Sequence, residues 1–207
     1  MGHIRDYDYS LLEEVIFLKE EETNQIINFK DLFQNGNPIL VEIGCGNGHF
    51  IIDKALKNTD KNFIGIDIKQ DRLVRCREKE TKNSLKNLKW ICGDAFFVIR
   101  DLFEDNSIDT IYMTFPDPWP KRRHHKNRLF KKEFVDVFYT KLIQNGLFIF
   151  VTDHKEYFDK SFDVIKNDKR FIVNANDIDD EFSISLFGYK WRSENRDFNI
   201  FILKKST

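Results

Sequence analysis

The 207-residue chain has few cysteines and prolines and lacks long apolar runs. Its three cysteines, Cys45, Cys76 and Cys92, are widely spaced and form no Cys-x-x-Cys pair, which argues against a disulfide framework or a structural zinc site. Charged residues follow Met1 closely, and no apolar stretch approaches the roughly 18 residues that a membrane helix requires. These absences predict a soluble, cytoplasmic protein without a metal site.

Only four prolines occur, and three of them, Pro116, Pro118 and Pro120, fall within five residues. Proline fixes φ and lacks an N–H donor, so neither a helix nor a central strand is expected here. This stiff loop carries one carboxylate, Asp117, and one large aromatic, Trp119. A dense basic run follows it, consisting of Lys121, Arg122, Arg123, Lys126, Arg128, Lys131 and Lys132. The combination is typical of a site that grips a phosphate backbone and places one group against a base. A proline-capped surface loop before a solvated basic helix is the alternative.

The formal net charge is only -1, so any positive potential must be a local patch. With 41% hydrophobic residues and this length, the chain is expected to form one domain with short appendages. Residues 1–36 are charged and mixed, and the Asn35-Gly36-Asn37-Pro38 sequence ends them. They are predicted to form an N-terminal helical extension, and residues 37–207 the main domain.

From residue 39 onward, strand-like and helix-like segments alternate. Strands are predicted over residues 39–43, 62–66, 88–92, 108–113 and 147–151, and helices over 49–56, 70–82, 95–102, 129–143 and 154–166. Residues 171–175 and 198–203 are candidates for the last strands. Strict alternation of this kind predicts an α/β fold, in which a mostly parallel sheet carries helices on both faces.

Three glycines, Gly44, Gly46 and Gly48, stand where the first predicted strand turns into the first helix. Glycines at every second position allow unusual dihedral angles and a close approach of a ligand to backbone amides. A dinucleotide-binding turn has the spacing Gly-x-Gly-x-x-Gly, which this turn lacks. With Glu42 two residues upstream, the turn favours a ligand that has an amino acid moiety and no phosphate, namely S-adenosylmethionine. A tight turn without a ligand is the alternative.

Further acids follow successive strands. Asp67 ends the second strand and is expected to accept hydrogen bonds from both hydroxyls of a ribose. Asp94, with Ala95 after it, follows the third strand and is expected to accept from an adenine amino group. Each acid alone is more readily explained as a helix N-cap, since Asp commonly starts helices. Because the carboxyl ends of parallel strands share one edge, Glu42, Asp67 and Asp94 together favour a nucleoside pocket.

Two more acids follow the fourth and fifth strands. Asp117 is expected beside the same crevice, near the methyl group of a bound cofactor. Asp153 is expected either to accept a hydrogen bond from a base or to cap the next helix. Three of the five histidines, His124, His125 and His154, have no metal-site spacing with any cysteine and are expected to contact phosphate or solvent.

The chain resembles the bacterial tRNA (guanine-N(7)-)-methyltransferases over roughly residues 36–205. The resemblance rests on the glycine turn, the following acid and above all Phe115-Pro116-Asp117-Pro118-Trp119-Pro120-Lys121-Arg122-Arg123-His124. It implies a Rossmann-like class I S-adenosylmethionine-dependent methyltransferase domain over residues 37–207. It further implies that the cofactor is contacted by Glu42, Asp67, Asp94 and Asp117.

The same resemblance implies roles at the substrate. Asp117 resembles the family's active-site residue, and Lys121 and Asp153 resemble its substrate contacts. Near the C-terminus the family has Thr-x-Tyr-Glu, which is best matched by Ser185-Leu186-Phe187-Gly188. Ser185 is therefore expected at the substrate, whereas Gly188 lacks the family's carboxylate. Glu181 or Glu194 is a possible substitute.

The implied activity is methyl transfer to N(7) of a guanine in the variable loop of tRNA. N(7) has a free lone pair, so alignment of the reactants is the main requirement. Asp117 is expected either to stabilise the positive charge that develops on guanine or to hold the edge of the base. The side chains of Arg122, Arg123 and Lys126 are expected to follow the RNA backbone. The alternatives are a methyltransferase for base amines or proteins and a non-catalytic RNA-binding module on the same fold.

Overall fold

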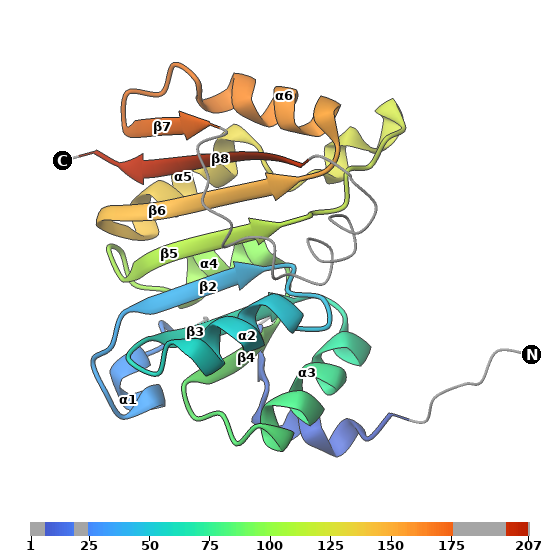
Figure 1. Ribbon diagram of the computed structural model, residues 1–207, viewed down its shortest axis with the longest axis vertical. Helices are drawn as coiled ribbons and strands as arrows, with labels where there is room; N and C mark the ends of the chain where they lie inside the picture. Colours follow the sequence, from blue (N-terminus) through green and yellow to red (C-terminus); the bar gives the residue numbers. More distant parts are fainter. Residues whose placement is uncertain (1–6, 19–24, 176–197, 207) are drawn as a thin grey trace, which may run out of the picture.

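A computed structural model describes residues 7–18, 25–175 and 198–206 (Figure 1). The 3₁₀ helices are η1 (Tyr9–Glu14) and η2 (Arg122–Asn127). The α-helices are α1 (Phe29–Phe33), α2 (His49–Lys57), α3 (Gln70–Lys82), α4 (Ala95–Leu102), α5 (Lys132–Lys141) and α6 (Lys155–Ile165). The strands are β1 (Ile16–Phe17), β2 (Ile39–Ile43), β3 (Asn62–Asp67), β4 (Leu88–Cys92), β5 (Ile108–Thr114), β6 (Leu142–Thr152), β7 (Phe171–Ala175) and β8 (Asn199–Lys205).

The strands form one sheet in the order β1-β4-β3-β2-β5-β6-β8-β7. All pairings from β1 to β6 are parallel, whereas β8 runs antiparallel to both of its neighbours. The arrowheads of β2, β5 and β6 therefore point to the same edge in Figure 1. The chain moves outward in one direction from β2 to β4 and then restarts on the other side of β2 with β5. Ligands of open α/β sheets bind outside the carboxyl ends of the strands at such a switch point.

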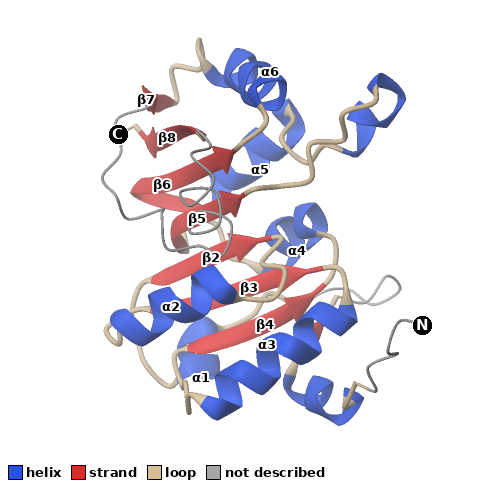
Figure 2. Ribbon diagram, turned by 45° about the vertical axis from the view of Figure 1, so that its right-hand side comes forward, coloured by secondary structure: helices blue, strands red, loops and turns tan. Residues whose placement is uncertain are grey.

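Helices cover both faces of the sheet (Figure 2). Buried side chains of α1, α4, α5 and α6 pack on one face, and those of η1, α2 and α3 pack on the other. Side chains of a strand point alternately to the two faces of the sheet. Val41 therefore packs with the α1, α4, α5 and α6 layer, and Leu40 packs with the η1, α2 and α3 layer. Many of the 21 phenylalanines meet in the first layer, where the rings of Phe138 and Phe148 stack at 4.1 Å. The predicted α/β architecture with helices on both faces is thus confirmed.

Most predicted elements have the expected bounds, and two predictions need correction. The helix predicted over 129–143 extends only from Lys132 to Lys141, and part of the basic run before it forms η2. The strand expected over 147–151 is longer, because β6 begins directly after α5, at Leu142. The chain bends sharply between the observed start of β6 at Leu142 and the predicted start at residue 147. Asn145 has φ 63°, and a Cβ on Gly146 would lie 2.9 Å from the carbonyl oxygen of Ile143. A side chain at position 146 would therefore collide with the backbone, so glycine is required there.

The described part of the N-terminal segment is not entirely helical, because it contributes strand β1 to the edge of the sheet. Buried Arg77 of α3 fastens this segment, since its guanidinium contacts Glu14 at 2.6 Å and Glu80 at 2.5 Å. Glu80 also accepts from the indole N–H of Trp90 at 2.5 Å. This network connects Glu14 at the end of η1 to Trp90 of strand β4. The domain boundary at residue 36 stays a prediction.

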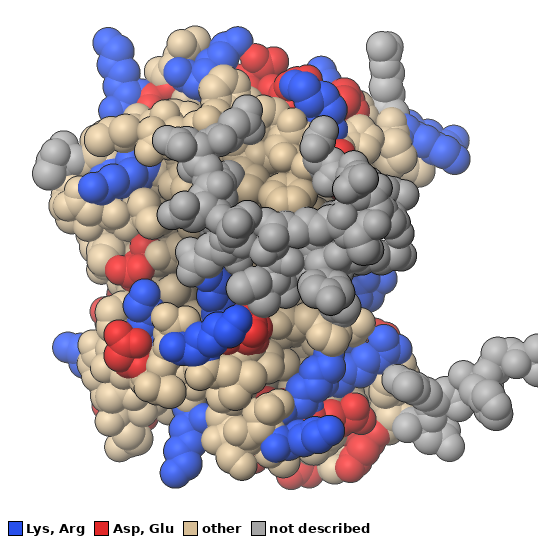
Figure 3. Space-filling view, in the orientation of Figure 1, with Lys and Arg blue, Asp and Glu red and all other residues tan. Residues whose placement is uncertain are grey.

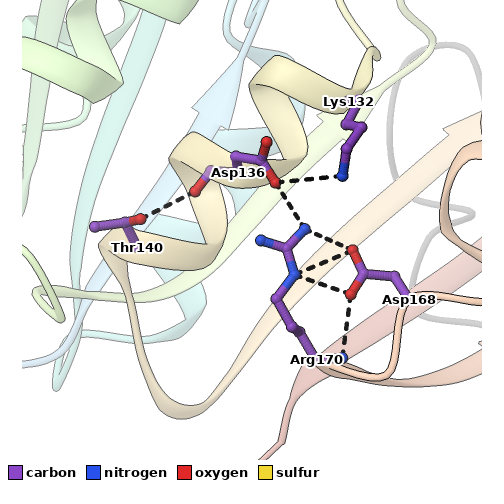
Figure 4. Close-up of polar contacts among 5 residues, drawn as sticks. All are labelled: Lys132, Asp136, Thr140, Asp168 and Arg170. Carbon is purple, nitrogen blue, oxygen red and sulfur yellow. Dashed lines mark hydrogen bonds and ion pairs between the residues drawn. The ribbon is translucent and has the colours of Figure 1, made fainter.

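The far edge of the sheet is fastened to α5 by one arginine (Figure 4). Arg170 contacts Asp136 of α5 at 2.7 Å and Asp168 at 2.6 Å. Its guanidinium also lies 4.8 Å from the ring centre of Tyr139. Hydrogen bonding to Arg170 lowers the pKa of the Asp168 carboxyl. These contacts position the start of β7 against the helix.

Within residues 7–18, 25–175 and 198–206, no helix is long and apolar enough to span a membrane. Among the same residues, no cluster of three or more His, Cys, Asp or Glu side chains has the arrangement of a metal site.

Candidate functional site

Two adjoining cavities lie at the carboxyl ends of the central strands. The first, of about 250 Å³, is lined in part by Asp67, Asp94, Ala95, Asp117, Trp119 and Asn127. The second, of about 210 Å³, is lined in part by Glu42, Gly46, Asn47, His49 and Thr114. The two share the wall residues Gly44, Arg72, Phe115 and Asp117 and are hereafter called the strand-end crevice. The structure therefore brings together the four acids that the sequence pointed to.

Glu42 is the buried acid of the crevice, with only 2% of its surface exposed. Its Oε1 atom accepts a hydrogen bond from the hydroxyl of Thr114 at 2.7 Å. Its Oε2 atom has no hydrogen-bond partner of normal geometry among the described residues. Burial raises the pKa of Glu42 to about 8, although hydrogen bonding to Thr114 counters part of the effect. The site therefore holds an unpaired carboxyl oxygen that a cationic group would satisfy.

The glycine turn has the unusual backbone that its sequence predicts. Gly44, Gly46 and Gly48 have φ values of 68°, 56° and 71°, which side chains rarely adopt. A Cβ on Gly44 would meet no atom within 4 Å, so this position faces open space. Gly48 differs, because a Cβ there would lie 2.8 Å from the ring of Trp90 and it lines neither cavity. The requirement for glycine at position 48 thus comes from its left-handed backbone and from core packing, and not from space for a ligand.

Asp67 is buried at the end of β3 and organises the turn. Its carboxylate accepts from the backbone amides of Gly46 and Lys69, both at 2.9 Å. It also contacts the guanidinium of Arg72 at 3.3 Å. Sequence reasoning missed Arg72, which lines both cavities; its position in the first turn of the helix after Asp67 is the available signal. A ribose hydroxyl that binds Asp67 would either share the carboxylate with Arg72 or displace the guanidinium of Arg72 from it.

Asp94 is the N-cap of α4, and its side chain accepts from the amide of Phe96 at 2.9 Å. The capping alternative is therefore realised. Asp94 and the following Ala95 nevertheless both line the first cavity. Because capping uses Oδ1, the carboxylate keeps acceptor capacity on the side of the cavity.

The proline loop forms one wall of the crevice and carries exposed Asp117. Phe115 and Trp119, on either side of the Pro116-Asp117-Pro118 sequence, have φ values of 49° and 44°. Left-handed backbone at non-glycine residues costs free energy and persists only where the surroundings enforce it. The ring of Trp119 lies 5.8 Å from that of His124, edge to face, and also lines the first cavity. Both packing and ligand contact are therefore open to this indole.

One cation of the basic run is structural. Arg128 is buried, and its Nε donates to the backbone carbonyl oxygen of Pro118 at 2.8 Å. The same guanidinium contacts Glu156 of α6 at 2.8 Å and lies 4.8 Å from the ring centre of Tyr157. The pKa of Glu156 is held below its usual value by this arginine. Arg128 therefore anchors the loop, although it belongs in sequence to the basic run that was expected to hold a phosphate backbone.

Other cations of the run are exposed, including Lys121, Arg123 and Lys126. Arg122 begins η2. Lys131 is also exposed, and its ammonium donates to the backbone carbonyl of Lys126. On the face drawn in Figure 3, Lys and Arg side chains are interspersed with acids. The basic run is thus a local positive feature on a nearly neutral chain.

Asp153 is exposed and does not cap α6, because His154 occupies the N-cap and accepts from the amide of Tyr157 at 3.2 Å. The capping alternative for Asp153 is therefore excluded, and its contact with substrate stays a prediction. Ser185 and Gly188 lie outside the described residues, as do the possible substitutes Glu181 and Glu194.

Comparisons with known proteins agree with this site. Residues 36–198 match the family model described as "Putative methyltransferase". A tRNA (guanine-N(7)-)-methyltransferase of Buchnera aphidicola subsp. Baizongia pistaciae is 39% identical over 150 residues, which cover 72% of this chain and 62% of the relative. One of Actinobacillus pleuropneumoniae serotype 5b is 33% identical over 180 residues, which cover 86% of this chain and 72% of the relative. A third relative is the tRNA (guanine-N(7)-)-methyltransferase of Pasteurella multocida. The matches to these three relatives cover between 54% and 72% of the relatives' own lengths.

The fold is similar to that of a solved 16S rRNA methyltransferase, KamB. The TM-score is 0.65 at 12% identity, and the match covers 94% of this chain and 99% of that chain. At this identity the likeness concerns the fold alone. The predicted Rossmann-like class I methyltransferase fold is confirmed.

Proposed function

Because the chain belongs to the tRNA (guanine-N(7)-)-methyltransferase family, we propose that it transfers the methyl group of S-adenosylmethionine to N(7) of a guanine in the variable loop of tRNA. The observation that carries the proposal is the strand-end crevice. Its walls combine Glu42, Asp67, Asp94 and Asp117 with the glycine turn and the strained proline loop.

The residues of the crevice suit the charged and polar groups of the cofactor. The unpaired, buried Oε2 of Glu42 suits the ammonium group of the methionine moiety. Open space at Gly44 gives that moiety access to the backbone of the turn. Asp67 and Asp94 line the neighbouring cavity, where they would hold the ribose hydroxyls and the adenine amino group. When bound, the sulfonium of the cofactor supplies the methyl group.

The residues of the chain then have the task of alignment. N(7) of guanine attacks the methyl carbon with its own lone pair, so no base is required to remove a proton before attack. Orientation of the two reactants accounts for a large part of the rate. Guanine acquires a positive charge in this step, and the carboxylate of Asp117 would stabilise it. The anchor from Arg128 to the carbonyl of Pro118 keeps this loop in position.

The RNA is expected to approach over the basic run. Lys121, Arg122, Arg123 and Lys126 follow the proline loop directly and would contact phosphates. Asp153 and Ser185 are proposed as further substrate contacts. These contacts fix the register of the RNA, whereas the crevice selects the base.

Nucleoside analysis tests the proposal directly. The protein is incubated with tRNA and methyl-labelled S-adenosylmethionine, and the digested RNA is analysed for labelled nucleosides and for the position of the label. Label in N(7)-methylguanosine of the variable loop supports the proposal. Label in an exocyclic amine or in protein would contradict it, and tRNA binding without any transfer would favour the non-catalytic module.

A further inference from the structure

A groove opens beside the strand-end crevice, between the first turn of α4 and residues 126–134. Its volume is about 600 Å³, within the range of roughly 300–1,000 Å³ that ligand sites show. Its wall is formed by Asp94, Phe96, Phe97, Lys126, Asn127, Arg128, Leu129, Lys131, Glu133 and Phe134. Asp94, Asn127 and Leu129 also line the first cavity of the crevice, so the two spaces adjoin each other. We call it the α4 groove.

One wall of the α4 groove carries an aromatic side chain that the core does not use. Phe97 is 43% exposed, whereas the next two residues, Val98 and Ile99, are fully buried. The guanidinium of Arg100 lies 4.9 Å from the ring centre of Phe97 and is held by both carboxylate oxygens of Asp101. An exposed aromatic ring thus lies at the edge of the groove, with a fixed guanidinium over one of its two faces.

The other wall carries positive charge. Lys126 and Lys131 are both exposed, and the ammonium of Lys131 is oriented by its hydrogen bond to the carbonyl of Lys126. Two acids, Asp94 and Glu133, also line the groove, so its charge is mixed. Asp94 uses its side chain to cap α4. Phosphates and bases alternate along single-stranded nucleic acid. A site for it therefore combines cations with an exposed aromatic ring, as this groove does.

We propose that the α4 groove binds a nucleotide that neighbours the target guanine in the tRNA. Its base stacks on Phe97, and its phosphate contacts Lys126 and Lys131. The inference rests on the proposed function, because Asn127 and Leu129 of the groove wall also line the cavity that holds Asp117, where the target base would be methylated. An acidic peptide would also satisfy the lysines, but a flat base matches the exposed ring and the guanidinium better.

Substitution of Phe97 tests the stacking. Phe97→Ala should weaken tRNA binding by roughly 5- to 150-fold, the contribution of one stacked base. Affinity for S-adenosylmethionine should not change. Phe97→Leu keeps apolar surface but lacks the ring, so it should behave like the alanine variant, whereas Phe97→Trp should keep the affinity. Because Phe97 is exposed, none of these changes should unfold the protein. Val164→Ala, at an exposed apolar residue of α6, is the matched control.

Two further measurements complete the test. The tryptophan of Phe97→Trp should lose fluorescence when tRNA binds, in excess of the change seen in the parent protein. Lys126→Gln and Lys131→Gln should each lower the slope of log affinity against log salt by about one unit. A Phe97→Ala variant with the parent's tRNA affinity would overturn the inference. That result is independent of methylation, so it is distinguishable from failure of the proposed function, in which the parent would not form N(7)-methylguanosine.

Discussion

The guanidinium of Arg128 donates to the backbone carbonyl of Pro118, 10 residues earlier in the chain, at 2.8 Å. The same group contacts Glu156 of α6, so a helix on one face of the sheet fixes the loop that carries Asp117. Two φ values near 45° at Phe115 and Trp119 show that this loop is held in a costly conformation. Arg128 thus belongs to the basic run in sequence but acts as an anchor in the fold.

Arg128→Met, which keeps the apolar stem, should lower the methyl-transfer rate at saturating tRNA by roughly 10- to 100-fold, because small displacements of a reacting site have effects of this size. Affinity for S-adenosylmethionine should change little. Single-turnover kinetics measure the rate. The matched control, Glu156→Gln, leaves the bond to Pro118 in place and should retain most activity. Equal rates in the two variants would show that the anchor is not needed.

Glu42 makes cofactor binding dependent on pH. Its pKa is raised to about 8 by burial, so the carboxyl is protonated in the free protein at about pH 6.5, where the cofactor's amino group is charged. Binding of that ammonium should expel close to one proton. Calorimetry in buffers of different ionisation enthalpy counts the protons released. Glu42→Gln should release none and bind more weakly; a parent protein that also releases none would refute this assignment.

The same carboxyl affects stability in the absence of cofactor. Its pKa rises from 4.5 to about 8 on folding, so the folded state binds more protons between these values. The stability that protonated Glu42 contributes is therefore fully present below pH 4.5, falls as the pH rises and is lost above about pH 8. Denaturant unfolding across this range should give a flatter profile for Glu42→Gln than for the parent.

Asp67→Asn should weaken S-adenosylmethionine binding by roughly 1.5–3 kcal/mol, the range for hydrogen bonds to a charged group. The amide keeps the shape of the side chain, but it cannot accept from both Gly46 and Lys69 and also bind a ribose. Calorimetry gives the affinity. Asp71→Asn, in the first turn of α3, is the control and should bind as the parent does. Unchanged affinity in a folded Asp67→Asn protein would remove Asp67 from the site.

Asp117→Asn should lower the methyl-transfer rate by roughly 10²–10³, the scale for loss of one preorganised electrostatic group. The side chain is exposed, so the fold and the cofactor affinity should be nearly unchanged. If Asp117 instead holds the edge of guanine, apparent tRNA affinity should fall with the rate. Single-turnover rates at saturating tRNA, compared with binding isotherms, separate the two roles. A variant with the parent's rate and affinity would leave Asp117 only a structural part of the loop.

The sequence predicts the interior of this fold well because buried strands leave a local pattern. The runs Ile39–Ile43 and Leu88–Cys92 are mostly apolar and end at glycines, and their bounds are those of β2 and β4. Strand β1 has only two residues and exists through its pairing with β4, so no local pattern marks it. The helix expected from residue 129 begins only at Lys132, and the backbone amide of Phe130 donates instead to the hydroxyl of Tyr157 at 3.4 Å.

The site shows the same division. Acids at strand ends are predictable, since parallel strands bring their carboxyl ends to one edge. The partners of those acids are harder to predict from the sequence. Arg72 contacts Asp67, and Thr114 contacts Glu42, only after the strands and helices have packed together. Gly48 has a clear glycine signal, yet its cause, the ring of Trp90 42 residues later, is visible only in three dimensions.

Strand β8 lies between β6 and β7 although it follows both of them in the chain. During synthesis, β6 therefore leaves the ribosome before its neighbour β8 does. Until residues 199–205 emerge, the outer edge of β6 presents unpaired backbone groups beside the buried rings of Phe148 and Phe150. Open apolar edges invite pairing with other chains. The order of translation thus creates an interval in which the nascent protein needs shielding, and chaperone supply is expected to govern the yield of folded molecules.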